Sequence, residues 1–327
     1  MKKLINAPDT VLAESLDGFA AAHSAILTLG DDRKFIRRKT LKPGKVALIS
    51  GGGSGHEPLH GGFVGMGMLD AACPGQVFTS PTPDQMMAAA EAVDTGAGCL
   101  FIVKNYEGDV MNFDMAREMS GRDIATVITN DDVAVENSSY TTGRRGVAGT
   151  MIVEKVVGAA AEAGRSLIEL RELGVRVNSA TRSMGVALTS CTVPAAGTPT
   201  FTLAEDEMEM GVGIHGEPGR RREKLASANE IVDELLDAVV TDLPYGSGDE
   251  VALMLNGLGG TPISELYILY GRAAQQLADK GINVTRSYVG EYCTSLDMAG
   301  ASLTLVKLDD ELTALLEAPA EIPIRVF

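Results

Sequence analysis

The sequence predicts an α/β fold made of two α/β lobes whose sheets are mostly parallel or mixed. Two observations predict it: several β-branched runs are each followed by glycines and then a helical pattern, and 327 residues exceed what one small core holds. A change of texture near residue 183 divides the chain. We therefore expect an N-terminal lobe over residues 1–183 and a C-terminal lobe over residues 184–327.

Four apolar runs predict buried strands, at residues 45–50, 99–104, 124–128 and 185–189. Between them, residues 84–93 and 150–163 show a helical pattern rich in alanine and methionine. Gly164 is typical of a residue that follows a helix end. These helices would cover the faces of a sheet.

The C-terminal half carries its own alternation of elements. Ser227 and Glu230 are spaced as a capping box, which predicts a helix that runs to Val240. Beyond Pro244 the pattern predicts a strand, a helix and two more strands, at residues 251–256, 264–280, 282–289 and 302–308. No internal repeat or long linker is present, so we expect the lobes to pack closely.

Net charge excludes two classes of partner. The chain carries a formal charge of -16, from 28 Lys+Arg against 44 Asp+Glu, which repels nucleic acids and anionic membrane surfaces. No apolar run approaches the roughly 20 residues that span a bilayer. Asn6, Pro8 and Asp9 interrupt the apolar core that a signal peptide needs. We expect a cytoplasmic protein.

The four cysteines stand far apart in the sequence and form no CxxC pair. They are Cys73, Cys99, Cys191 and Cys293. This spacing favours reduced thiols, buried as small apolar groups, over a disulfide or zinc framework, so we expect no metal site in this chain.

A glycine-rich segment, SGGGSGHEP at residues 50–58, directly follows the first strand. Ligands of open α/β sheets bind at the carboxyl ends of strands, and glycines let backbone N–H groups approach an oxygen-rich ligand. The segment is neither a Walker A loop nor GxGxxG, because Pro58 takes the last glycine position, which disfavours a nucleotide. A bare glycine run fits a tight turn equally well, but a turn does not require His56.

Lys104 and Asp109 follow the second strand at the same edge of a parallel sheet. An aspartate there accepts a proton from a hydroxyl, and a lysine holds a substrate oxygen. Taken alone, the segment is more typical of a capping aspartate and a solvated lysine. Ser80 offers a hydroxyl in a neighbouring segment, which reads equally well as the entry to a helix.

His215 lies between glycines in GVGIHGEPG, at residues 211–219, which leaves its imidazole open to close approach. A neutral imidazole nitrogen adds reversibly to a ketone to give a hemiaminal, and Glu217 is placed to orient the ring. A lone histidine is more often a hydrogen-bonded part of a turn, and that interpretation stays open. We interpret His23 and His60 as structural.

Eight motifs in one order resemble the dihydroxyacetone kinase family, specifically its dihydroxyacetone-binding subunit. They are GGGSGHEP, ACPGQVFTSPTPDQ, VKNYEGDVMNF, DDVAVE, GRRGVAGT, SCTVPAAGTPTFTL, MEMGVGIHGEPG and EYCTSLDMAG. They cover nearly the entire chain, far beyond what one glycine loop signals. The resemblance implies two α/β lobes that form one unit of about residues 7–326, in a homodimer.

The same resemblance assigns site residues. His215 matches the histidine that forms the hemiaminal, and His56 and Asp109 match the acid/base pair beside the transferred hydroxyl. The groups that bind substrate oxygens match Gly53, Ser54, Gly55, His56, Lys104 and Asp109. The implied reaction phosphorylates dihydroxyacetone to dihydroxyacetone phosphate.

The resemblance implies no cofactor in this chain. In such proteins a helical nucleotide-binding kinase subunit (DhaL type) or fused domain carries ADP or ATP with Mg²⁺. A phosphocarrier subunit (DhaM type) of the phosphoenolpyruvate-dependent phosphotransferase system acts through the separate subunit. The length of 327 residues favours this arrangement over fused, ATP-dependent relatives, although length alone leaves the phosphoryl donor open.

Two other functions stay open. Relatives exist that bind the ketone as non-catalytic sensors and coactivate a transcription factor, and the substrate could be another short sugar such as erythrulose or glyceraldehyde. The presence of both His56 and Asp109 favours catalysis.

Overall fold

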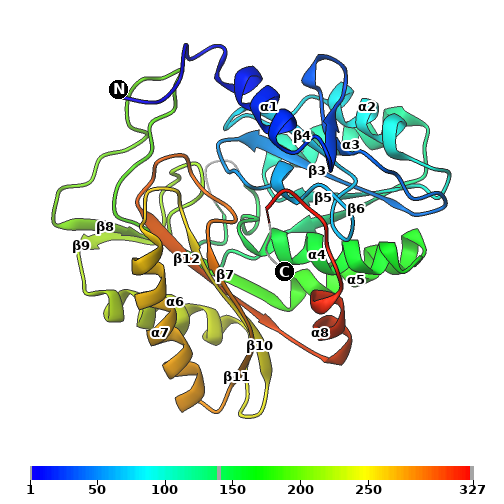
Figure 1. The fold of residues 1–327 in the computed structure, drawn as a ribbon. Coiled ribbons are helices and arrows are strands. Elements are labelled where there is room, and N and C mark those ends of the chain that lie inside the picture. The colour runs from blue at the N-terminus through cyan, green and yellow to red at the C-terminus, as the bar shows by residue number, and fades with distance from the viewer. Residues whose placement is uncertain (1, 138–140, 325–327) are drawn as a thin grey trace.

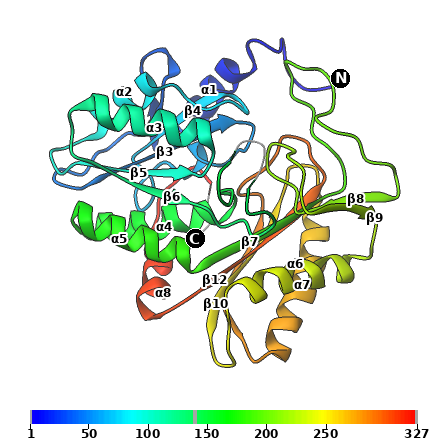
Figure 2. The same ribbon diagram turned by 180° about the vertical axis from the view of Figure 1, so that it is seen from behind.

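A computed structural model describes residues 2–137 and 141–324 of the chain. Two six-stranded sheets and the helices around them form successive layers (Figures 1 and 2). The helices are α1 (Val11–Ala22), α2 (Pro83–Val93), α3 (Glu107–Ser120), α4 (Gly149–Glu162), α5 (Leu167–Ser179), α6 (Ala228–Asp242), α7 (Ile263–Asp279) and α8 (Asp310–Glu317). This architecture confirms the expectation of an α/β fold with mostly parallel or mixed sheets.

The first sheet has a parallel centre. Its strand order is β1 (Leu27–Leu29), β2 (Ile36–Arg38), β4 (Ala71–Val77), β3 (Ala47–Ser54), β5 (Cys99–Lys104) and β6 (Ile124–Thr129). Strands β4, β3, β5 and β6 run parallel, and β1 and β2 add antiparallel pairs at one edge. The carboxyl ends of the parallel strands therefore meet at one edge, where the candidate residues gather.

The glycine-rich segment does not begin as a loop, because β3 continues through Gly51–Gly53 to Ser54. These glycines pair with β4, and a Cβ on Gly51 would lie 2.5 Å from the Cys73 carbonyl oxygen. A short 3₁₀ turn, Gly61–Phe63, follows in place of a long helix. A tight turn was the alternative interpretation of these glycines, but here they permit a close approach of two strands.

The second sheet is mixed. Its strand order is β11 (Asn283–Gly290), β10 (Glu250–Gly257), β12 (Gly300–Lys307), β7 (Thr181–Ala187), β8 (Glu207–Met210) and β9 (Arg221–Lys224). One pair, β10 with β11, is parallel and the other four are antiparallel. Strands β8 and β9 form a hairpin at one edge, and its loop carries His215.

Apolar clusters hold the layers together. Helices α2 and α3 cover one face of the first sheet, and α6 and α7 cover the outer face of the second. Between the sheets lies α4, whose residues from Gly149 to Ala161 are all buried. A helix that is apolar around most of its circumference belongs in such an interior position. Two charged residues of α4, Glu154 and Lys155, are therefore buried as well.

Most predicted elements lie within a few residues of their observed positions. The capping box of Ser227 and Glu230 begins α6, as predicted. The strand predicted at residues 185–189 begins earlier in the structure, at Thr181. Its first residues are polar and therefore did not look like a buried strand, but the Ser183 hydroxyl donates a hydrogen bond to Asp131 inside the protein. Helix α3 was not predicted, since its exposed face carries methionines that obscure the periodicity.

The predicted boundary between residues 183 and 184 falls inside β7, so the division at that position stays a prediction. All four cysteines are free and buried, as expected. Over the described ranges, no helix is both long and apolar enough to cross a membrane.

Candidate active site

One cavity of about 580 Å³ collects segments from both sheets. It lies where β3, the loop after β4, the start of α3 and the β8–β9 loop converge. Its lining is Gly53, Phe78, Thr79, Ser80, Tyr106, Glu107, Gly108, Asp109, Asn112, Thr200 and His215. Three of the predicted site residues thus share one cavity: Gly53, Asp109 and His215.

His215 is held in one tautomer. Its Nδ1–H donates to Glu217 Oε1 over 2.9 Å, and the His215 backbone N–H donates to Glu217 Oε2 over 2.9 Å. A carboxylate only accepts hydrogen bonds, so in the neutral ring the proton lies on Nδ1 and Nε2 keeps a free lone pair. Glu217 thus makes the hydrogen bond that its expected orienting role requires, and the free Nε2 of His215 is a nucleophile.

The Glu217 carboxylate is buried beside a cation. Burial alone would raise its pKa, but His215 and Arg145 lower the pKa to about 2. The Arg145 side chain is fully buried and bonds to Asp132. A Cβ on Gly213 would lie 2.0 Å from Glu217 Oε2, so this glycine, two residues before His215, makes room for the carboxylate. Glu217 therefore stays ionised and holds the His215 ring.

His56 follows β3 of the first sheet and is held by the segment after β11 of the second sheet. Its Nδ1–H donates to the Thr294 carbonyl over 2.7 Å, so Nε2 is unprotonated. Burial, followed by the charges of His215 and Lys104, holds the pKa of His56 well below its ordinary value. Its ring lies 4.7 Å from the His215 ring, between centroids. His56 therefore presents a neutral acceptor next to the nucleophile.

Asp109 lies in the first turn of α3 and is buried. The positive end of the helix dipole favours a negative charge there. Lys104, at the end of β5, places its Nζ 3.8 Å from Asp109 Oδ2. A Cβ on Gly52 would lie 2.3 Å from Lys104 Nζ, so this glycine makes room for the ammonium group. Lys104 is buried, so the alternative interpretation of this segment, in which the lysine is solvated, is wrong.

Three buried polar atoms around His215 have no hydrogen-bond partner among the described residues. They are His56 Nε2, Asp109 Oδ1 and the Tyr106 hydroxyl. Unpartnered buried polar groups are uncommon in native proteins and call for an explanation. Their clustering beside a nucleophilic nitrogen indicates a binding site for a small ligand with several hydroxyl or carbonyl oxygens.

Two predicted residues are turned away from this cavity. The Ser54 hydroxyl donates to the Gly75 carbonyl, and the Gly55 N–H donates to the Glu57 carboxylate. Their assignment as groups that hold substrate oxygens stays a prediction. Ser80, whose role was left open, does line the cavity.

Sequence reasoning missed several supporting residues. Tyr106 packs its ring edge-on to His215, 4.7 Å between centroids. The Thr294 carbonyl accepts a hydrogen bond from His56, and the charge of Arg145 keeps Glu217 ionised. Their partners lie far away in the sequence, so spacing gave no signal. His60 was interpreted as structural, yet its Nε2 lies 2.9 Å from Lys104 Nζ.

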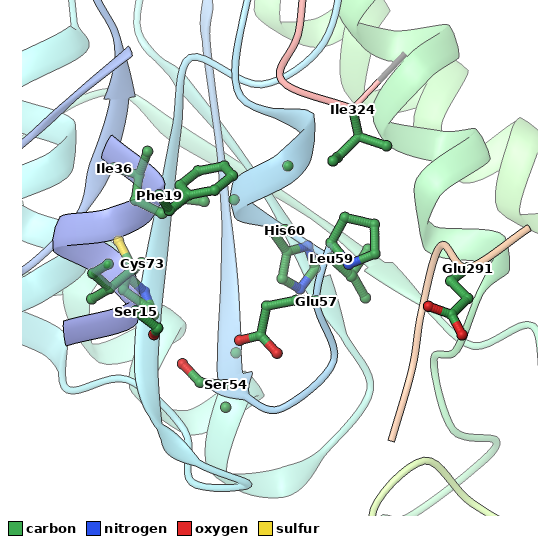
Figure 3. Close-up of a pocket in the computed structure, with 18 residues that line it drawn as sticks. Ser15, Phe19, Ile36, Ser54, Glu57, Leu59, His60, Cys73, Glu291 and Ile324 are labelled. Atoms are coloured by element: carbon green, nitrogen blue, oxygen red, sulfur yellow. The ribbon is translucent and has the colours of Figure 1, made fainter. Parts of the chain in front are cut away.

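A second cavity, of about 480 Å³, shares Gly53 with the first (Figure 3). Apolar side chains such as Phe19, Ile36 and Leu59 line it, with His60 on one wall. Asp109 and His215, which line the first cavity, are not among its lining residues. The chemistry described above therefore belongs to the first cavity.

A family model described as the Dak1 domain matches residues 17–324. The chain belongs to the Dak1 domain family. Membership confirms the resemblance to dihydroxyacetone kinases that the eight motifs indicated.

A curated Dak1 relative from Escherichia coli K12 is 50% identical over 99% of this chain and 98% of that protein. It is named the dihydroxyacetone-binding subunit DhaK of a PEP-dependent dihydroxyacetone kinase. Two solved structures show the same Dak1 fold, each at 35% identity and a TM-score of 0.89. One is the dihydroxyacetone kinase operon co-activator Dha-DhaQ, with 94% of this chain and 96% of that chain covered.

The other is the dihydroxyacetone kinase of C. freundii in complex with AMP-PNP and Mg²⁺. The match covers 99% of this chain and 61% of that longer chain. In the present Dak1 chain, residues 2–137 and 141–324 bring together no three His, Cys, Asp or Glu side chains suited to a metal ion. The Gly51–Gly53 backbone is paired in a strand and forms no phosphate cradle.

Proposed function

We propose that this chain is the dihydroxyacetone-binding subunit of a dihydroxyacetone kinase. It captures dihydroxyacetone covalently on His215 and presents a terminal hydroxyl for phosphorylation. The observation that carries this proposal is the His215 ring, held through Nδ1 by Glu217 so that Nε2 stays free, beside three unpartnered polar atoms. The 50% identity to a subunit with that printed name supports the same substrate.

His215 Nε2 attacks the keto carbon, a C–N bond forms and the C=O π bond breaks. The ring becomes positive while the bond forms, and the Glu217 carboxylate offsets that charge through Nδ1–H. Over the whole step the oxygen gains one proton and the ring loses its Nδ1 proton, so no net proton is consumed.

Capture also explains selectivity. A three-carbon ligand gains at most roughly 1.5 kcal/mol per non-hydrogen atom from noncovalent contacts. Glycerol offers similar hydroxyls but no carbonyl, so only a covalent bond to His215 separates the two well. Once bound, the ketone is fixed and a hydroxyl is placed for Asp109 and His56, which accept its proton as the oxygen attacks phosphorus.

The phosphoryl donor is supplied by partners. We assign ADP or ATP with Mg²⁺ to a nucleotide-binding kinase subunit, fed by a phosphocarrier of the phosphotransferase system. Full-length similarity to a PEP-dependent subunit supports this route. We further propose a cytoplasmic homodimer, in keeping with the negative charge and the sequence resemblance.

Intact-protein mass spectrometry tests the capture. Wild-type protein with dihydroxyacetone is expected to gain the full mass of the ketone, since addition loses no water, and to gain nothing with glycerol. An unmodified mass at saturating ketone contradicts the proposal. Erythrulose and glyceraldehyde, as competitors, measure how far the pocket accepts other short sugars.

The same samples separate the subunit from a co-activator of the kind that the 35% identical structure represents. A subunit turns over when the nucleotide-bearing partner and the phosphoryl donor are added. An adduct without turnover would identify a sensor. The unpartnered Asp109 Oδ1 and His56 Nε2 favour turnover.

Replacing Gly52 with alanine is expected to lower kcat about 10²-fold while the adduct still forms. The new Cβ would lie 2.3 Å from Lys104 Nζ and 3.4 Å from Asp109 Oδ2, so the buried ammonium must move from its place beside the base. Displacements of about 1 Å have such effects on rate. Steady-state kinetics and adduct mass provide the measurement.

Gly18→Ala is the matched control, because a Cβ at this exposed helical position meets nothing within 4 Å. Full activity of Gly52→Ala would show that the position of the Lys104 ammonium does not matter to turnover.

A further inference from the structure

Helix α4 buries a carboxyl group that the proposed chemistry does not use. Glu154 is fully buried, on a helix packed between the two sheets. Its Oε2 has no hydrogen-bond partner among the described residues. An ionised carboxylate in such a position is costly, so its retention calls for a role.

Two hydrogen bonds and one ion pair lead from this carboxyl group to the active site. Glu154 Oε1 lies 2.5 Å from His60 Nδ1, and His60 Nε2 lies 2.9 Å from Lys104 Nζ. Lys104 in turn lies 3.8 Å from Asp109 Oδ2. Four buried titratable side chains thus form one connected row that ends at the candidate base.

The direction of each hydrogen bond follows from the donors available. An ammonium group only donates, so His60 Nε2 accepts from Lys104 and the ring proton lies on Nδ1. That proton points to Glu154 Oε1 and to Ser50 Oγ, which is 3.0 Å away and itself donates to the Ile102 carbonyl. Burial and the charge of Lys104 hold the pKa of His60 well below its ordinary value, which keeps the ring neutral.

We propose that Glu154 and His60 are positioning residues for the Lys104–Asp109 pair, and that the charge on Glu154 sets how strongly Asp109 attracts the substrate proton. This inference rests on the proposed function, since Asp109 is the base of that reaction. It adds two residues of the chain to those that the resemblance assigned.

The charge on Glu154 changes in an accessible pH range. Burial raises its pKa to about 8, against the opposing effects of Lys104 and Ser50. The other titratable groups that face it are His60 and the Cys293 thiol. Near neutral pH Glu154 is mostly protonated, and it gains a negative charge as pH rises through about 8. That charge weakens the pull of Lys104 on Asp109, so Asp109 becomes a stronger base.

His60 also borders the second cavity. Its ring lies on the wall of the apolar cavity, beside Leu59 and across from the Phe19 ring (Figure 3).

Infrared titration tests the coupling without a partner subunit. Wild-type protein is expected to show a buried protonated-carboxyl band that disappears with a midpoint near pH 8 and is absent from Glu154→Gln. Because removal of the Asp109 charge stabilises the Glu154 anion, Asp109→Asn should lower that midpoint by about one pH unit. An unchanged midpoint in Asp109→Asn, or no band at neutral pH, overturns the inference.

The pH dependence of turnover, measured with the complete kinase, is the second test. Wild-type kcat should rise about tenfold between pH 7 and 9, and Glu154→Gln should lose this rise because glutamine cannot ionise. Glu154→Leu, which cannot accept from His60, should lower kcat about tenfold at every pH with KM unchanged. The exposed Glu172→Gln on α5 is the control and should match the wild type.

The outcomes separate the two claims. A wild type that forms no adduct contradicts the proposed function, whatever the infrared titration shows. A wild type that turns over, with a Glu154→Gln profile that rises in the same way, contradicts the inference alone. If Glu154→Leu does not fold, the pH profile of Glu154→Gln and the infrared midpoint of Asp109→Asn still test the inference.

Discussion

Alanine in place of His215 is expected to abolish the dihydroxyacetone adduct and to lower kcat/KM by at least about 10³-fold. The ketone then loses its covalent bond, and a ligand of this size binds poorly through hydrogen bonds alone. Intact mass after incubation with ketone, followed by turnover with the nucleotide-bearing subunit, gives both quantities.

His23→Ala is the control for this variant, because His23 lies at the end of α1 and packs on Phe19. It should retain both adduct and turnover. A His215→Ala protein that still gained the mass of the ketone would place the covalent bond on another residue, and the proposed mechanism would fail.

Asparagine in place of Asp109 is expected to keep the adduct and to lower kcat by about 10²–10⁴-fold. General base catalysis contributes a factor of that size, and asparagine has the same shape without the ability to accept a proton. The adduct persists because His215 and Glu217 do not bond to Asp109. Separate measurements of adduct mass and kcat distinguish capture from transfer.

Asp237→Asn makes the same chemical change on the exposed face of α6 and should behave as the wild type. Should Asp109→Asn turn over at the wild-type rate, the proton would have to leave by way of His56, whose Nε2 is the other unpartnered acceptor in the site.

The sequence predicted elements whose apolar pattern is local. The run CLFIVK matches β5 residue for residue, and Ser227 with Glu230 marked the start of α6. Elements without a clear apolar face were not predicted. Helix α3 is one of them, because its apolar residues Met111, Met115 and Met119 are exposed. Local periodicity carries no information about which face the rest of the chain will cover.

The sequence predicted the role of a site residue when its partners are close to it in the sequence, and missed the role when the partners are far away. Glu217 lies two residues from His215, so its role was visible in the sequence. The partner of His56 is the Thr294 carbonyl, 238 residues away, and no spacing rule reaches that far. His60 looked structural for the same reason, because Glu154 and Lys104 meet it only in the folded chain.

The bond between the His56 ring and the Thr294 carbonyl has a practical consequence. Each half of the polypeptide carries one imidazole of the pair, and the half with His215 also supplies the clamp for the other ring. Fragments made separately would each lack part of the trap, so reaction with the ketone should report the intact tertiary structure and serve as an assay of refolding.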